Sequence, residues 1–231
     1  YALGSSSFIP PFKGKDLPEV VSIRAIKDVE KVKELAKGAQ NAVVIGGGVL
    51  GLEAAWELRK AKLNVTVLEG APVLMAGKVD PETVRILTDV AKQKGIEIKV
   101  GVKIDEISGA EHVDGVVADG EKIAADLVLV STGVRANIGI AKDAGLVTDR
   151  AVIVDKNMAS SVEGIYAAGD CAQFDGANIT IWPVASEMGR IAGANAAGEA
   201  LVYEPDVNGM SFHGMGTSLF SVGDIGTKEG V

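Results

Sequence analysis

The chain has 231 residues, of which 47% are hydrophobic, so a sizeable core can form and disorder is not expected. A formal net charge of −8 argues against nucleic acid or an anionic membrane as a partner. The single cysteine, Cys171, excludes an internal disulfide and a C-x-x-C site and suits a reducing, cytoplasmic setting, and no apolar run approaches the length of a membrane span.

The first 40 residues predict a linker and a helix. Residues 1–18 are rich in Ser, Pro and Gly, which indicates the end of a strand followed by an extended segment. Residues 28–37 are predicted to form a helix, with Asp28 as its N-cap, an apolar stripe at helical spacing, and Gly38 at its end.

Residues 42–69 read as a strand, a glycine-rich turn, a helix and a second strand. Gly46, Gly48 and Gly51 fit the pattern G-x-G-x-x-G. The first glycine permits a tight turn, the second lets a pyrophosphate approach the backbone, and the third lets the helix pack closely on the strand. The pyrophosphate is expected on the free amides at the helix start. Glu69 ends the second strand about 20 residues later, where an acid can accept hydrogen bonds from the adenosine ribose.

Strand, turn, helix and acid together predict a dinucleotide-binding unit. Two alternatives remain open: a Gly-rich turn without a ligand, and a Glu69 that is only a solvated carboxylate. Four apolar residues of the helix are spaced to face the sheet, and Trp56 among them is expected in the core rather than as a stacking platform. They are Val49, Leu52, Ala55 and Trp56.

Further elements complete this first part of the chain. Residues 80–94 predict a helix with Asp80 as its N-cap, and residues 96–100 predict a third parallel strand. Residues 102–123 predict an antiparallel meander, and residues 127–130 a buried strand. The fold class predicted is therefore α/β, a Rossmann-like three-layer dinucleotide-binding domain with an antiparallel meander.

The second half has a different pattern. Residues 152–154 predict a strand, residues 164–170 a strand that runs into a Gly-Asp turn, and residues 185–200 a helix. Residues 208–231 are expected to begin a third unit.

Several motifs in one order resemble a known family. The chain resembles the flavin- and pyridine-nucleotide-dependent disulfide oxidoreductase superfamily. Within it the chain is most similar to NADH oxidases, rubredoxin reductases and the flavoprotein part of NADH-dependent nitrite reductases. The motifs that carry the resemblance are Leu3-Gly4-Ser5 with Pro10-Pro11, Gly46-Gly47-Gly48-Val49-Leu50-Gly51-Leu52-Glu53, Ser131-Thr132-Gly133-Val134-Arg135, and Gly164-Ile165-Tyr166-Ala167-Ala168-Gly169-Asp170.

The resemblance implies an NAD domain inserted in a partial FAD-binding domain. Residues 1–17 would end the first FAD half and form a linker, and residues 18–137 would be the NAD-binding domain. Residues 138–207 would be the second FAD half, and residues 208–231 would start the C-terminal interface domain, through which the family dimerises. The chain is thus expected to be a fragment without the first FAD half and with most of the interface domain missing, so that Leu219, Phe220 and Val222 would lack cover.

The resemblance also implies roles for single residues. Asp170 would hold the ribityl and pyrophosphate region of FAD, and its alternative is an N-cap for a following turn. Trp182 and Val184 would lie at the flavin pyrimidine edge, beside a helix start that can stabilise negative charge, although ordinary packing is an alternative for Trp182. Glu53 would lie near the nicotinamide carboxamide, with an exposed helical glutamate as the alternative. The cofactor-binding residues expected are Gly46, Gly47, Gly48, Val49, Leu50, Gly51, Glu53, Glu69 and Gly133 for NAD, and Gly169, Asp170, Trp182 and Val184 for FAD.

The function implied for the intact parent is a flavin oxidoreductase. It would take hydride from NADH to FAD and pass electrons to oxygen, peroxide, rubredoxin, nitrite or a disulfide, with no general acid or base and no metal. The fragment alone is expected to be inactive. Valine at position 49 departs from members with an aromatic gate there, and Cys171 is expected to be a buried thiol. The alternatives are a non-catalytic dinucleotide-binding module and one subunit of a split flavoenzyme.

Overall fold

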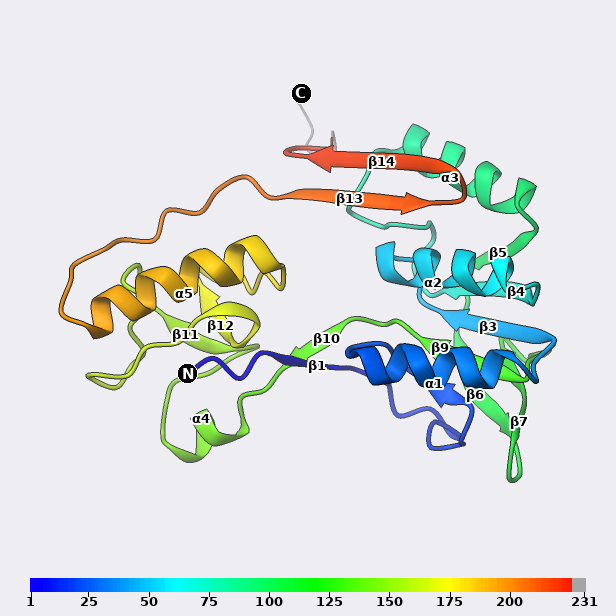
Figure 1. Ribbon diagram of the computed structural model, residues 1–231, viewed down its shortest axis with the longest axis horizontal. Coiled ribbons are helices and arrows are strands. Elements are labelled where there is room, and N and C mark those ends of the chain that lie inside the picture. Colours follow the sequence, from blue (N-terminus) through cyan, green and yellow to red (C-terminus); the bar gives the residue numbers. More distant parts are fainter. Residues whose placement is uncertain (226–231) are drawn as a thin grey trace. The chain divides into compact units, whose positions relative to one another are not determined.

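The computed structural model describes residues 1–225, which form two compact units (Figure 1). The larger unit contains residues 7–133 and takes up the chain again from residue 207, and the smaller contains residues 1–6 and 134–206. Each unit has a hydrophobic core of its own. The chain therefore leaves the smaller unit after its first residues and returns to it after residue 133.

The larger unit is built on a five-stranded parallel sheet with the order β2-β9-β3-β4-β5. From the central β3 the chain adds β4 and β5 on one side and later β9 on the other, so the order switches direction between β3 and β9. In open α/β sheets, ligands bind at such a switch point. The elements are Val20–Val21 (β2), Ile26–Ala36 (α1), Asn41–Ile45 (β3), Val49–Lys60 (α2), Asn64–Glu69 (β4), Pro81–Gln93 (α3), Ile96–Val100 (β5), Ile104–Gly109 (β6), Val113–Ala118 (β7), Glu121–Ala124 (β8) and Leu127–Val130 (β9).

Helices cover one face of this sheet and an antiparallel sheet covers the other. Val44 and Leu129 lie in the core shared with α1, α2 and α3. Their neighbours Val43 and Val128 lie in the core shared with β6 and β7. Because successive strand residues point to opposite faces, burial on both faces explains why β3 and β9 are unbroken apolar runs. The predicted three-layer α/β fold with its meander is confirmed.

Helix α1 begins at Ile26 and not at residue 28. Its N-cap is Ala25, and the Asp28 carboxylate, within the first turn, accepts hydrogen bonds from the amides of Ala25 and Arg24 at 2.8 and 2.9 Å. The prediction of Asp28 as N-cap is wrong, because this acid satisfies the free amides from the third helical position instead. These hydrogen bonds, that of Ala25 foremost, lower the pKa of Asp28.

The remaining elements predicted for this unit are confirmed. Asp80 caps α3 by accepting hydrogen bonds from the amides of Glu82 and Thr83, both at 3.0 Å. β5 pairs with β4 in parallel, and β6, β7 and β8 form the antiparallel meander. Trp56 is half-buried against the core of α2, with Nζ of Lys60 6.0 Å from its ring centroid.

A hydrogen-bonded ion pair joins the segment before β2 to β7. Nδ1 of His112 lies 2.6 Å from Oε1 of Glu19, and the amide of Val113 donates to Oε2 of Glu19 at 3.0 Å. Burial raises the pKa of Glu19, but the hydrogen bonds from Val113 and His112 together outweigh it, so the pKa is lowered overall. The hydrogen bond to Glu19 raises the pKa of His112.

We expect this pair to make stability depend on pH. The contribution of His112 is fully present below its ordinary pKa of 6.5 and is lost as the pH rises through its raised folded value. The contribution of Glu19 is present above 4.5 and is lost as the pH falls through its lowered folded value. Urea unfolding of the chain and of His112→Asn should therefore differ more at about pH 6 than at about pH 9. The exposed His213 supplies the control, His213→Asn, and an equal difference at both pH values for His112→Asn would contradict the assignment.

The smaller unit is built around one long helix. Met188 and Ile191 of this helix pack against Val152 and Val154, which lie in a strand of a two-stranded parallel sheet. The elements are Ser5–Ser7 (β1, whose last residue falls in the larger unit), Val134–Ala136 (β10), Gly139–Asp143 (α4), Val152–Val154 (β11), Gly169–Cys171 (η1, a 3-10 turn), Ala172–Phe174 (β12) and Trp182–Ala196 (α5). β11 is confirmed as predicted.

The strand predicted over residues 164–170 is wrong as a continuous strand. Only Tyr166 makes a bridge, to Ala159, and the Gly-Asp turn is the 3-10 turn η1. The backbone of this stretch instead makes single hydrogen bonds to two irregular segments: the amide of Ala167 donates to the carbonyl of Met158, and the amide of Ala168 donates to the carbonyl of Tyr1.

Helix α5 also differs from its prediction, since it begins at Trp182 rather than 185 and ends at Ala196 rather than 200. Pro183 falls in the first turn, where its missing N–H has no helical partner to lose. Gly198 follows the end of the helix with a φ of +95°, a conformation that does not continue a helix.

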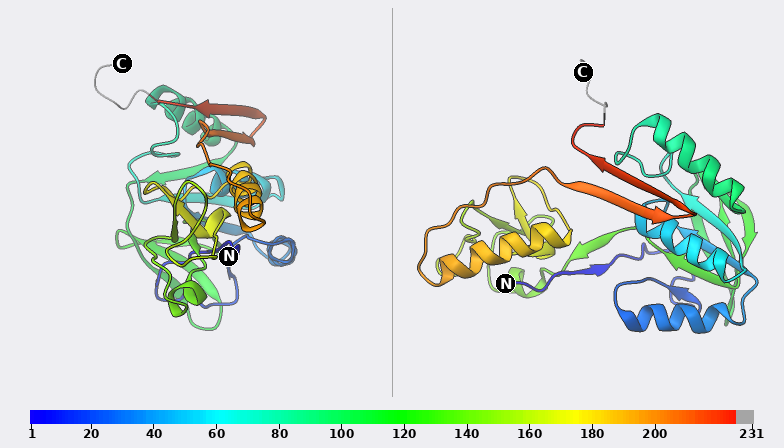
Figure 2. Two further views of the ribbon diagram at one scale, coloured as in Figure 1. Left: turned by 90° about the vertical axis from the view of Figure 1, so that its left-hand side faces the viewer. Right: turned by 45° about the horizontal axis from the view of Figure 1, so that its top comes forward.

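Residues after 207 form an antiparallel hairpin, Gly209–Gly214 (β13) and Thr217–Val222 (β14), which packs on α2 within the larger unit (Figures 1 and 2). Phe212 is completely buried and Leu219 packs against the same core. The expected lack of cover is therefore wrong for Leu219, whereas Phe220 and Val222 are 67% and 50% exposed. Residues 226–231 of this predicted segment lie outside the described residues.

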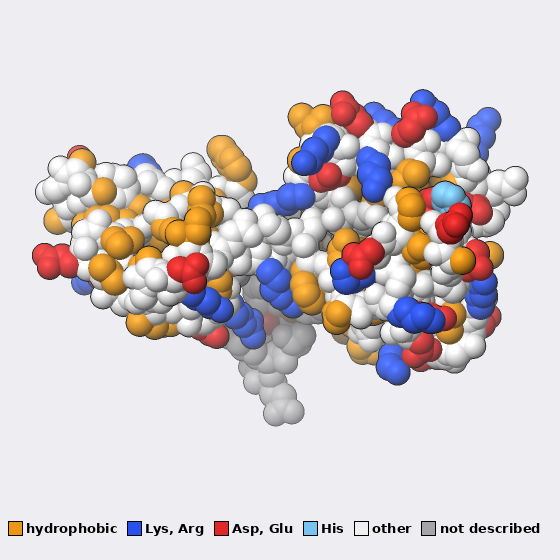
Figure 3. Space-filling model, turned by 90° about the horizontal axis from the view of Figure 1, so that it is seen from below, with side chains coloured by type: hydrophobic (Ala, Val, Ile, Leu, Met, Phe, Trp, Pro, Cys, Tyr) orange, Lys and Arg blue, Asp and Glu red, His pale blue; other side chains and the backbone are white. Residues whose placement is uncertain are grey.

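Among residues 1–225, no helix is long and apolar enough to cross a membrane. On the face shown in Figure 3, acidic and basic side chains are interspersed.

Candidate functional site

In the glycine turn after β3, the main chain lies in close contact with the main chain of neighbouring segments. Gly46 has a φ of +119°, and a Cβ there would lie 2.2 Å from the carbonyl oxygen of Ser131. A Cβ on Gly51 would lie 2.0 Å from the carbonyl oxygen of Gly46, so α2 packs directly on the turn. Gly48 has no atom within 4 Å of its Cβ position, so the space in front of it is open. Each glycine has the geometry that a pyrophosphate-binding turn requires.

The carboxylate of Glu69 is fixed by this turn. Oε2 accepts a hydrogen bond from the amide of Gly47 at 2.6 Å, and Oε1 accepts one from the amide of Ala71 at 2.6 Å. Glu69 is half-buried and lies at the end of β4, next to β3. Two backbone donors therefore hold the acid in one orientation, and each oxygen keeps acceptor capacity for a hydroxyl group.

Helix α2 presents an uncapped N-terminus to the same place. Its N-cap is Gly48, which makes no side-chain capping bond, and its first turn contains no acidic residue. The amides of Val49 and Leu50 are among the first-turn amides that an α-helix leaves without a helical acceptor. Val49 packs partly on the core, whereas Leu50 is 68% exposed beside this N-terminus. The positive end of the helix dipole and the free amides favour an anion here.

Parallel pairing brings the strand ends together at one edge of the sheet. Gly46 follows β3, Glu69 ends β4 and Ser131 follows β9, which flanks β3 on the other side. Gly133 lies two residues after Ser131 with a φ of +89°, and its carbonyl accepts a hydrogen bond from the amide of Phe8 at 3.0 Å. The predicted NAD residues thus gather at the carboxyl edge, at the switch point of the sheet.

Glu53 has a structural partner that the sequence did not reveal. One of its carboxylate oxygens accepts a hydrogen bond from the amide of His213 at 3.2 Å. This bond ties α2 to β13, so Glu53 is more than an exposed helical glutamate. Its expected position near a nicotinamide carboxamide stays a prediction.

Asp170 is held in the smaller unit by a buried serine. Oγ of Ser5, which is 7% exposed, donates to Oδ2 of Asp170 at 2.6 Å. Asn178 donates to the main-chain carbonyl of Asp170 at 3.0 Å. Asp170 lies within η1, whose N-cap is Ala168, so Asp170 does not cap this turn. Its expected role at FAD stays a prediction.

The start of α5 lies beside this turn. Gly169 has a φ of +77°, and a Cβ there would lie 3.3 Å from Cβ of Ala185, so the turn packs closely on α5. The helix has no side-chain cap at its N-terminus. Val184 is buried in the core, whereas Trp182 is 81% exposed, so of the alternative of ordinary core or surface packing for Trp182 only the core half fails.

Comparison with known proteins assigns the family. The family model described as pyridine nucleotide-disulphide oxidoreductase matches residues 1–189. The chain belongs to this family. It is 35% identical to an NADH oxidase of Methanocaldococcus jannaschii over 216 residues. The aligned region covers 90% of this chain and 48% of that protein. It is 33% identical to a nitrite reductase [NAD(P)H] of Bacillus subtilis, over 99% of this chain and 29% of that protein.

A solved structure supports the same assignment. The ferredoxin reductase of Rhodopseudomonas palustris superposes with a TM-score of 0.88 at 32% identity, over 95% of this chain and 56% of that one. The chain therefore spans between 29% and 56% of the length of these relatives.

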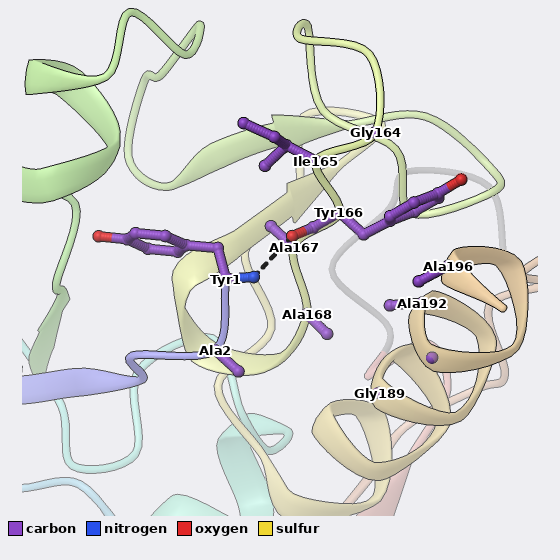
Figure 4. Close-up of a pocket in the computed structure, with 11 residues that line it drawn as sticks. Tyr1, Ala2, Gly164, Ile165, Tyr166, Ala167, Ala168, Gly189, Ala192 and Ala196 are labelled. Carbon is purple, nitrogen blue, oxygen red and sulfur yellow. Dashed lines mark hydrogen bonds between the residues drawn. The ribbon is translucent and has the colours of Figure 1, made fainter.

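A pocket of about 410 Å³ lies in the smaller unit (Figure 4). It is lined by Tyr1, Ala2, residues 164–168, and small residues on one side of α5, among them Gly189 and Ala192. Figure 4 shows the amino group of Tyr1 bonded to the carbonyl of Tyr166 at its wall. None of the thirteen predicted cofactor residues lines this pocket.

Three supporting residues were missed at the sequence level. Ser131 packs on Gly46, Leu74 packs on Gly47, and Ser5 holds Asp170. Ser5 and Ser131 lie in motifs that carried the resemblance, so a signal existed for them, whereas nothing local pointed to Leu74. Among residues 1–225 no group of three or more His, Cys, Asp or Glu side chains could hold a metal ion.

Proposed function

We propose that this chain is the NADH-binding part, with a portion of the FAD site, of an oxidoreductase that passes electrons from NADH through FAD to an acceptor. The observation that carries the proposal is the joined geometry of the open Gly48 backbone and the Glu69 carboxylate fixed 2.6 Å from the amide of Gly47. An anion site and a hydroxyl-accepting acid then lie on either side of one turn, as a dinucleotide requires.

In the larger unit, the amides at the start of α2 would bind the pyrophosphate and Glu69 would accept the adenosine ribose hydroxyls. Glu53 and Gly133 would lie toward the nicotinamide. The protein's contribution is binding and orientation, because the hydride chemistry belongs to the cofactors.

The residues present fit one side of an FAD site. Asp170 is a half-buried carboxylate oriented by Ser5, so it can accept hydrogen bonds from sugar hydroxyls. The uncapped start of α5, with the exposed Trp182, can face the flavin pyrimidine edge and stabilise negative charge there. FAD, when bound, would supply the acceptor of the hydride.

The domain assignment belongs to this proposal. Residues 18–137 would be the NAD-binding domain, residues 1–17 and 138–207 would belong to the FAD domain, and residues from 208 would start an interface domain that makes a homodimer. The relatives named NADH oxidase, nitrite reductase and ferredoxin reductase use different acceptors, so the acceptor of this chain could be oxygen, nitrite or a small electron carrier. A buried, unpaired Cys171 supports a reducing, cytoplasmic setting.

We expect the 231-residue chain purified alone to hold little or no FAD. Its single G-x-G-x-x-G turn lies in the unit proposed to bind NADH, so the diphosphate of FAD would lack an equivalent anchor. The visible spectrum after purification, with and without added FAD, measures this directly. Flavin bands at one equivalent per chain would show that the smaller unit suffices for FAD. NADH titration of the same sample tests the NADH assignment separately.

A further inference from the structure

The loop that follows β4 is bonded to the glycine turn. Residues 70–79 leave Glu69 and pass Gly47, where the amide of Met75 donates to the carbonyl of Gly47 at 3.0 Å. Leu74 and Met75 are buried beneath α2, at 0% and 2% exposure. Both backbone groups of Gly47 are therefore hydrogen-bonded: its carbonyl accepts from the loop, and its amide donates to the Glu69 carboxylate.

The far end of this loop is bonded to the hairpin. Oγ of Ser221 donates to the carbonyl of Lys78 at 2.9 Å, and the amide of Lys78 donates to the carbonyl of Met75 at 2.8 Å. Ser221 faces inward, because residues 218, 220 and 222 of β14 are exposed while Leu219 and Ser221 are half-buried. Side chains alternate along a strand, so the inward register of Leu219 sets that of Ser221.

The hairpin is anchored to the larger unit by packing and by a hydrogen bond. Phe212 is 0% exposed in the core shared with α2, and the amide of His213 donates to Glu53. Ser221 is therefore held on a supported strand, and a continuous series of hydrogen bonds runs from Ser221 through Lys78, Met75 and Gly47 to Glu69.

We propose that Ser221 is a positioning residue for the nucleotide site: through the loop 70–79 it fixes the orientation of Glu69, and the hairpin β13–β14 is thus a working part of the NADH-binding unit. This inference rests on the proposed function. Loss of the Ser221 hydroxyl removes one support of the loop without touching any group expected to contact nucleotide. Orientation of Glu69 matters most for telling a ribose hydroxyl from a 2′-phosphate, so discrimination as well as affinity should fall.

The test compares three variants in the full chain by calorimetric titration with NADH and NADPH. Ser221→Ala should weaken NADH binding about threefold and reduce the ratio of the NADPH to the NADH dissociation constant. Ser221→Thr keeps the hydroxyl on a residue suited to a strand and should restore both values. Ser211→Ala, in the same hairpin with an exposed side chain, is the matched control and should change neither.

Hydrogen exchange supplies the second measurement. The amides of Gly47 and Met75 should exchange faster in Ser221→Ala and at the original rate in Ser221→Thr. An unchanged Kd ratio with unchanged exchange at these amides would overturn the inference, and so would equal effects of Ser221→Ala and Ser211→Ala. If the unmodified chain binds neither nucleotide, the proposed function fails, whereas NADH binding that ignores Ser221 refutes the inference alone.

Discussion

Gly51→Ala is expected to destabilise the larger unit by about 3 kcal/mol and to abolish measurable NADH binding. The added Cβ would lie 2.0 Å from the carbonyl oxygen of Gly46, which is backbone and cannot rotate away. Either α2 must move off the turn or the turn must open, and both movements disperse the amides that would hold the pyrophosphate. Urea unfolding gives the stability change, and NADH titration gives the loss of binding.

Gly48→Ala is the matched control for this prediction. Gly48 has a φ of −80° and no atom within 4 Å of its Cβ position, so alanine fits the folded chain. We expect stability to change by less than about 1 kcal/mol, since only N-cap preference is altered. NADH affinity should nevertheless fall at least about tenfold, because the methyl group occupies the space of the approaching diphosphate. If Gly48→Ala binds NADH as tightly as the unmodified chain, the pyrophosphate lies elsewhere.

Replacing Glu69 is expected to have the second largest effect, which is a change in the preference for NADH over NADPH. Beside a 2′-phosphate the carboxylate faces a like charge, and two unit charges 4 Å apart repel by about 4 kcal/mol at an effective dielectric near 20. Solvent lowers this figure, but a net penalty of about 1.4 kcal/mol already means tenfold weaker binding. Glu69→Ala should therefore weaken NADH binding and narrow its advantage over NADPH.

Glu69→Gln separates charge from geometry. Both carboxylate oxygens accept backbone amides at 2.6 Å, so the NH₂ group of a glutamine must face one of two N–H donors. We expect the variant to lose about 1–3 kcal/mol of stability, which urea unfolding measures, as well as nucleotide discrimination. A glutamine variant with unchanged stability would show that the two amide bonds do not hold the acid.

The local sequence pattern predicted most of the helices and strands of the larger unit, because the residues that define each of these elements lie within or next to it. The glycine spacing, the Asp80 cap and the apolar runs of β3 and β9 each act within a few residues of the element they define. The errors at Asp28 and at the start of α5 also lie within one turn. Asp28, the predicted cap of α1, lies inside its first turn. Pro183, predicted to precede α5, likewise lies inside the first turn of that helix.

Long-range contacts explain what the sequence could not show. The amide of His213 bonds to Glu53, 160 residues earlier, and Phe212 fills a core that α2 and the sheet create. No local feature of β13 indicates that it packs there rather than remaining uncovered. Ser5 and Asp170, 165 residues apart, form their hydrogen bond for the same reason, since only the fold brings them together.

Parallel calorimetric titration of the unmodified chain with NADH and NADPH, at one fixed ionic strength, tests the central claim most directly. The geometry of Gly48 and Glu69 predicts one NADH site per chain, with a dissociation constant at least about tenfold lower than that for NADPH. Equal affinities would mean that Glu69 does not accept the adenosine ribose, and absence of NADH binding would contradict the assignment of the glycine turn as a dinucleotide site.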